Sequence, residues 1–230
     1  MSEITIKVPD GEFFAYVAEP AQTPAPAIVV IQEIFGVNQV MRDICAWLAG
    51  AGFIAVCPDL FWRIEPGIEL TDKTEEEWAR AFELFGAFDP DKGAEDIQAA
   101  IAAARVHQGC NGKVGTIGYC LGGKMAYLSA TRTDSDASVG YYGVQIDQLL
   151  GEAGKIAKPL MLHIATEDQF VPKESQQAMI DGLSGNPQAT LHVYEGNDHA
   201  FARVGGAHYD AEAAERANRR SLDFLKTHLG

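Results

Sequence analysis

The feature that most constrains this chain is a glycine-rich hexapeptide, Gly118–Gly123, in which Cys120 stands between glycines. The residues before it, Lys113–Ile117, read as a short buried strand, and those after it, Lys124–Ala130, read as a helix. A strand that turns this sharply into a helix leaves little room for a Cβ atom at the flanking positions, which accounts for the glycines. The turn also places the thiol at a helix N-terminus, where the backbone dipole favours a thiolate.

Two interpretations of this turn are open. A strand, a Gly-x-nucleophile-x-Gly turn and a helix form the nucleophile elbow of α/β hydrolases, here with Cys120 in the place of serine. The same pattern also occurs as a plain glycine-rich turn around a small buried cysteine. The rest of the chain has to distinguish the two.

Length and charge limit the class of protein. A chain of 230 residues can bury the core of one α/β domain, so we predict a single domain over residues 1–230. The net charge of −14 argues against nucleic acid or an anionic membrane surface as a partner. No apolar run approaches the roughly 18 residues that span a membrane, and the N-terminus lacks a signal-peptide core. We therefore expect a cytoplasmic protein, as a monomer or a small homo-oligomer.

The spacing of the four cysteines does not suggest a zinc site or a thioredoxin-like motif. No pair has Cys-x-x-Cys spacing, so neither a zinc knuckle nor a thioredoxin motif is predicted. Cys45 in a predicted helix and Cys57 at a strand end read as small buried hydrophobic residues. We expect no metal and no organic cofactor.

Predicted strands and helices alternate along most of the chain. Residues 2–8 and 12–18 alternate in period two around a Pro-Asp-Gly turn, as an antiparallel hairpin should. Further strands are predicted at 27–31, 53–57, 113–117, 138–142, 159–164 and 190–194, and helices at 40–49, 91–107, 124–130, 173–184 and 209–228. This order predicts an α/β-hydrolase fold, with a mostly parallel central sheet, helices on both faces and an N-terminal antiparallel hairpin.

Residues 61–90 interrupt this alternation. Thr74–Glu77 has the pattern of a capped helix start, and the segment from Trp78 to Phe88 carries several large aromatic side chains. The segment could be a peripheral helix packed on the sheet. It could equally be a wall of an active-site cleft, since inserted segments between strands often carry substrate contacts.

Two polar residues follow late strands, where a hydrolase of this fold needs its acid and its base. Asp168 comes just after the strand at 159–164, and His199 comes after the strand at 190–194. Alone, Asp168 could be a turn or cap residue and His199 a surface histidine. Together with Cys120 they form the chain order nucleophile, acid, base. Cys120 would attack a carbonyl, His199 would take and return the proton, and Asp168 would fix the imidazole tautomer.

The chain resembles the dienelactone hydrolases (carboxymethylenebutenolidases), which are α/β hydrolases with a cysteine nucleophile. The shared motifs span nearly the whole chain: Gln32–Gly36, Pro58–Leu60, Gly118–Gly123, Gly140–Gly143, Glu167–Asp168 and His199–Arg203. The resemblance implies the triad Cys120, His199 and Asp168, and an oxyanion hole made by the backbone N–H groups of Leu121 and Ile34. It also implies that Glu33 lies beside the thiol and helps to deliver the thiolate when substrate binds.

The same resemblance indicates a change in the substrate site. The family substrate is a lactone with a free carboxylate, bound by two arginines and a tyrosine. Arg203 matches one arginine, while Trp78 stands in the place of the other and Phe82 in the place of the tyrosine. Phe35 and Tyr141 are further substrate-binding candidates within the shared motifs. The exchanges predict a more apolar pocket, and hence a less charged, larger or more hydrophobic ester or lactone.

The sequence thus predicts hydrolysis of a small lactone or ester through an acyl-cysteine intermediate. One alternative is a general carboxylesterase with an apolar pocket and no ring requirement. Another is a non-catalytic redox-sensing or ligand-sensing protein that uses the Cys120 thiol.

Overall fold

The fold is taken from a computed structural model, which describes residues 2–230. The chain forms two compact units, the first ending at Thr116 and the second comprising Ile117–Gly230. Strand β5 (Cys110–Tyr119) begins in the first unit and ends in the second. Across residues 2–230, no helix is both long enough and apolar enough to span a membrane.

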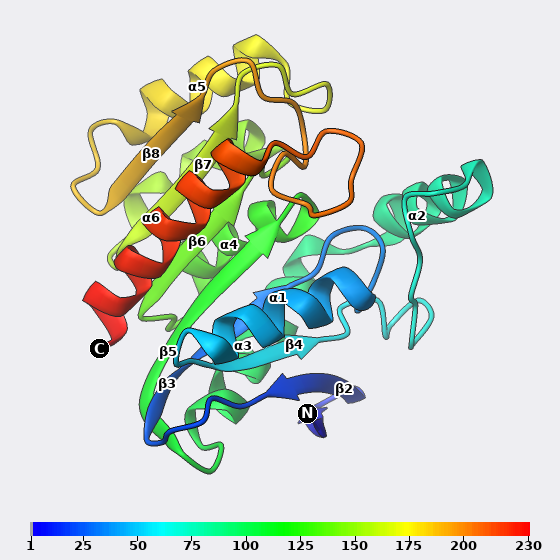
Figure 1. The fold of residues 1–230 in the computed structure, drawn as a ribbon, viewed down its shortest axis with the longest axis vertical. Helices are drawn as coiled ribbons and strands as arrows, with labels where there is room; N and C mark the ends of the chain where they lie inside the picture. Colours follow the sequence, from blue (N-terminus) through cyan, green and yellow to red (C-terminus); the bar gives the residue numbers. More distant parts are fainter. Residues whose placement is uncertain (1) are drawn as a thin grey trace. The chain divides into compact units, whose positions relative to one another are not determined.

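The first unit carries the predicted hairpin and the first parallel strands. Its elements are β1 (Ser2–Val8), β2 (Gly11–Ala18), β3 (Ala25–Ile31), α1 (Gln39–Gly50), β4 (Ile54–Pro58), α2 (Glu75–Ala87), α3 (Pro90–Arg105) and the start of β5. Its strand order is β1-β2-β4-β3-β5, antiparallel from β1 to β4 and parallel between β4 and β3. Helix α1 lies in front of these strands in Figure 1 and α3 lies behind them, so helices cover both faces.

The second unit carries further parallel strands. Its elements are the end of β5, α4 (Leu121–Arg132), β6 (Ala137–Tyr141), the 3-10 helix η1 (Ile146–Lys155), β7 (Leu160–Ala165), α5 (Lys173–Leu183), β8 (Ala189–Tyr194) and α6 (Ala211–Leu229). The strand order is β5-β6-β7-β8, and the β6–β7 and β7–β8 pairs are parallel. Helix α6 crosses one face of this unit and α4 packs on the other (Figure 1).

Burial on both faces accounts for the continuous apolar sequence of strands β4, β6 and β7. The side chains of β4 are all buried, and so are those of β6 and β7, as the continuous apolar runs predict for strands covered on both faces. Cys45 and Cys57 are fully buried, which confirms their interpretation as small core residues. η1 was not predicted.

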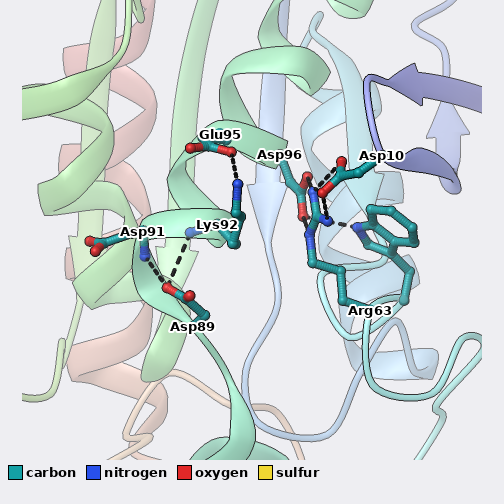
Figure 2. A network of polar contacts seen from close by, with 8 residues as sticks. Asp10, Arg63, Asp89, Asp91, Lys92, Glu95 and Asp96 are labelled. Atoms are coloured by element: carbon teal, nitrogen blue, oxygen red, sulfur yellow. Dashed lines mark hydrogen bonds and ion pairs between the residues drawn. The ribbon is translucent and has the colours of Figure 1, made fainter.

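Helix α2 begins where the sequence predicts. The hydroxyl of Thr74 accepts a hydrogen bond of 3.2 Å from the backbone N–H of Glu77, so Thr74 is the N-cap of α2. Helix α3 begins in a similar way, because a carboxylate oxygen of Asp89 accepts from the N–H groups of Asp91 and Lys92 (Figure 2). The inserted segment 61–90 therefore contains one capped helix and ends at the cap of the next.

The start of this insert is held by Arg63, whose guanidinium lies between two carboxylates (Figure 2). It donates to the hairpin residue Asp10 at 2.5 Å, and to Asp96 of α3 at 2.7 and 3.0 Å. Asp96 is 1% exposed and also accepts from the Trp62 indole, over whose ring the guanidinium lies at 4.3 Å. The two carboxylates raise the pKa of Arg63, so the guanidinium stays charged and is bound to both of them.

Candidate active site

The predicted elbow is present at the end of β5. Cys120 has φ 57° and ψ −114°, a conformation that residues with a side chain rarely adopt, and α4 begins at the next residue. A Cβ atom on Gly118 would lie 1.9 Å from the carbonyl oxygen of Gly122, so this position requires glycine. Strain at a cysteine between a strand and a helix is typical of a nucleophile elbow and not of a relaxed glycine-rich turn.

The candidate acid and base also lie in the second unit, after neighbouring parallel strands. Ala165 at the end of β7 pairs with Tyr194 at the end of β8, so the segments that follow them leave the same edge. Nδ1 of His199 lies 3.0 and 2.9 Å from the two carboxylate oxygens of Asp168. The structure therefore brings together two residues that are 31 positions apart in sequence. The contact leaves the other ring nitrogen, Nε2, to face a reacting group.

The electrostatics of His199 depend on burial and on two nearby acidic groups. Burial lowers the pKa of His199, but the charges of Cys120 and Asp168 and their hydrogen bonding outweigh it and raise the pKa to about 10. Among residues 2–230, no hydrogen-bond partner of Nε2 meets ordinary geometric limits. Loose nucleophile–base contacts are usual in ligand-free sites.

Aromatic rings surround the imidazole, and sequence reasoning missed them. Tyr142 lies edge-on at 5.0 Å and Phe170 at 4.9 Å between ring centroids. Phe170 is 39% exposed, so it presents an apolar surface beside the base. Leu162, Met179 and other apolar residues line a small cavity that also touches Asp168. These surroundings strengthen the electrostatic contact between acid and base.

The predicted oxyanion-hole donors lie in different units. Leu121 is the first residue of α4, and the first N–H groups of a helix have no partner within it. Ile34 follows β3 in the first unit, beside Glu33, and both side chains are buried. The roles of Ile34 and Glu33 toward Cys120 stay predictions.

Three predicted substrate-binding residues of the first unit form one aromatic cluster. The Trp78 ring meets Phe35 edge-on at 5.0 Å and lies 5.6 Å from Phe82, which is 47% exposed. Arg80 forms ion pairs with Glu65 and Glu83. The segment thus has an apolar aromatic face, and the guanidinium groups of Arg80 and Arg63 are bound to carboxylates instead.

Tyr141 and Arg203 have different surroundings in the second unit. Tyr141 is fully buried, and its hydroxyl bonds to Ser221 and Asn218 of α6. It is therefore better described as a core residue than as a substrate contact. Arg203 lies four residues after His199 and is buried to all but 8%, an unusual place for a guanidinium.

Comparisons with known proteins agree on one family. The family model described as "Dienelactone hydrolase family" matches residues 13–229. A protein of Azospirillum brasilense with the provisional name carboxymethylenebutenolidase is 54% identical, over 100% of both chains. The carboxymethylenebutenolidase of Pseudomonas putida is 45% identical, over 96% of this chain and 94% of its own.

A solved structure supports the fold. The crystal structure of a Klebsiella pneumoniae protein assigned to the dienelactone hydrolases aligns with a TM-score of 0.87 at 25% identity, covering 98% of this chain and 97% of its own. The predicted α/β-hydrolase fold is thereby confirmed, with its mostly parallel strands and N-terminal antiparallel hairpin.

Proposed function

Because this chain belongs to the dienelactone hydrolase family and is a hydrolase of carboxylic esters, we propose that it opens small lactones or esters through an acyl-cysteine intermediate. In this proposal Cys120 is the nucleophile, His199 is the base and then the acid, and Asp168 holds the imidazole in place. The observation that carries the proposal is the buried bond from His199 to Asp168, in the same unit as a strained cysteine at a helix N-terminus.

The reaction follows in two halves. The Cys120 thiol gives its proton to Nε2 of His199, and the sulfur attacks the substrate carbonyl carbon. The backbone N–H of Leu121 donates to the oxyanion that forms. The carbon–oxygen bond then breaks, and the leaving alkoxide takes the proton from the imidazolium. A water molecule, deprotonated by His199, attacks the thioester and releases the carboxylic acid and the thiol.

The charged form of His199 suits this sequence of proton transfers. A pKa of about 10 means that the imidazole readily holds a proton while the sulfur is negative. The bond from Nδ1 to Asp168 keeps Nε2 directed to the reacting group in both protonation states. Glu33, which the resemblance places beside the thiol, would in this proposal help to deliver the thiolate when substrate binds.

The aromatic cluster supports an apolar substrate. Trp78 and Phe82 stand where the resemblance places an arginine and a tyrosine, and the Trp78 ring contacts both Phe82 and Phe35. Arg203 is the remaining residue of the resemblance that could bind a carboxylate. We therefore propose that neutral or weakly charged lactones and esters are better substrates than the carboxylated dienelactone.

The test combines intact-protein mass spectrometry with a substrate panel. Wild-type protein mixed with an activated ester and quenched early should gain the mass of one acyl group, and the Cys120→Ala variant should gain none. The panel compares lactones with open-chain esters, each with and without a carboxylate. A general carboxylesterase would show no preference for the ring. Hydrolysis retained by Cys120→Ala would exclude the covalent mechanism, and absence of hydrolysis throughout would favour a sensor thiol.

A further inference from the structure

The segments that carry the acid and the base are joined by backbone hydrogen bonds that stop short of the catalytic side chains. Beyond the end of the β7–β8 pairing, the N–H of Thr166 donates to the carbonyl of Tyr194 at 3.1 Å. The N–H of Glu167 then donates to the carbonyl of Asn197 at 2.8 Å. Asp168 and His199 come next along the two segments. There a side chain, and not a backbone carbonyl, accepts the hydrogen bonds.

That side chain is Asp198. Its Oδ1 accepts a hydrogen bond of 3.1 Å from the backbone N–H of Gln169, the residue after the acid. The same oxygen accepts one of 2.6 Å from the backbone N–H of His199, the base itself. Hydrogen bonds to an ionised acceptor are roughly twice as strong as neutral ones. A single carboxylate oxygen therefore bridges the backbones of both catalytic segments.

The other oxygen of Asp198 is also held. Oδ2 lies 3.5 Å from the side-chain nitrogen of Gln169 and 3.3 Å from Nδ1 of His208. The Asp198 side chain is 25% exposed, whereas the side chains of Asp168 and His199 are 1% and 5% exposed. Asp198 is thus more exposed than the two catalytic side chains, and it contacts the backbone of His199 and of Gln169, the residue after Asp168, with both of its carboxylate oxygens held.

We propose that Asp198 is a positioning residue, whose carboxylate sets the distance and angle between His199 and Asp168 by holding the backbones of residues 169 and 199. This inference rests on the proposed function, since it assigns Asp198 a task in the same triad. The side chain touches neither substrate nor reacting atoms. Its effect is the alignment of Nδ1 with the Asp168 carboxylate, and through it the direction of Nε2.

The variants separate the hydrogen bonds from the charge. Asp198→Asn keeps an oxygen acceptor for the two N–H groups without the charge. Asp198→Glu keeps the charge but moves the acceptor by one methylene. Asp198→Ala removes both. Asp181→Ala is the matched control, because it removes one negative charge from an exposed side chain of α5 that accepts a hydrogen bond from its helix neighbour Gln177.

Two readouts are measured on each folded variant. The first is the proton NMR signal of the His199 Nδ1–H, which shifts downfield when it is bonded to a carboxylate and does not depend on hydrolysis. The second is kcat and KM for a neutral ester. We expect Asp198→Ala and Asp198→Glu to weaken or lose the downfield signal and to lower kcat by roughly tenfold to a hundredfold at nearly constant KM. Asp198→Asn and Asp181→Ala should keep the signal and most of kcat.

The proposal is overturned if Asp198→Ala and Asp198→Glu keep the wild-type signal, or if the asparagine variant loses it as completely as they do. Should the alanine variant not fold, the comparison of Asp198→Glu with Asp198→Asn decides by the same criterion. The NMR signal reports the bond from His199 to Asp168 directly. The test of Asp198 therefore remains decisive even if the Cys120→Ala result excludes the acyl-cysteine mechanism.

Discussion

Replacing Asp168 by asparagine should remove much of what keeps the His199 imidazole charged. The two side chains are only 1% and 5% exposed, and Nδ1 contacts both carboxylate oxygens. Burial alone would lower the pKa of His199, yet it is raised from 6.5 to about 10 by Cys120 and Asp168. That difference corresponds to about 5 kcal/mol in favour of the charged form, shared between the two acidic groups. Loss of one nearby charge should lower the pKa by about one to three units.

The sign of the effect on stability follows from the direction of the shift. A pKa that is higher in the folded state stabilises the protein fully below the unfolded value of 6.5, and this stabilisation is lost as the pH rises through about 10. The contribution of His199 to the free energy of unfolding should therefore fall between pH 6.5 and 10. In Asp168→Asn this fall should be smaller and should end at a lower pH.

The assay is a pH titration of nitrogen-labelled histidine followed by NMR, on wild type and Asp168→Asn. His163 is an internal reference, because burial holds its pKa well below 6.5 and its ring nitrogens bond to the hydroxyls of Tyr194 and Ser221. Its signals should stay those of a neutral imidazole in both proteins. Turnover should fall by about three to four powers of ten, because asparagine does not enforce the productive tautomer. Identical His199 titrations in the two proteins would refute the reasoning.

Three further predictions concern the first unit. Glu33→Gln should lower turnover and shift the pH dependence of Cys120 alkylation, and alkylation that follows the wild-type profile would contradict the role of Glu33. Trp78→Arg combined with Phe82→Tyr should raise kcat/KM for a carboxylated lactone relative to a neutral ester, by up to about tenfold from one charge-assisted bond; an unchanged ratio would mean that this helix does not face substrate. Asp96→Ala should lower the free energy of unfolding by about 3–5 kcal/mol in chemical denaturation, because it removes the buried partner of the Arg63 guanidinium; a loss below about 1 kcal/mol would show that Asp10 alone suffices.

Much of the fold could be predicted because the apolar patterns agree with the turn chemistry. The hairpin, the parallel strands and the capped start of α2 at Thr74 are local features, and each lies within a few residues of its predicted place. η1 (Ile146–Lys155) was missed because it contains two glycines, which disfavour a helix interior. It starts after Gln145, whose left-handed φ of 58° no local pattern indicates.

The candidate site could likewise be predicted only in part. The order of Cys120, Asp168 and His199 could be predicted, because the fold places such residues after particular strands. The bridging role of Asp198 could not, since its partner Gln169 is 29 positions away and the sequence shows only a loop carboxylate. Tyr141 was misassigned for a related reason: its motif marks the strand, but only the fold shows that its hydroxyl meets α6.

The ion pairs of Arg63 with Asp10 and Asp96 have a consequence for how this fold can change over evolutionary time. Arg63 fastens the beginning of the inserted segment to α3, the helix that begins just after the segment ends (Figure 2). Both ends of residues 64–89 are thus tied to α3, and a loop whose ends are fixed tolerates changes of length at little entropic cost. Residues of α2 can then change while the strands of the first unit keep their register, and under the proposed role of Trp78 and Phe82 such changes would alter the range of substrates.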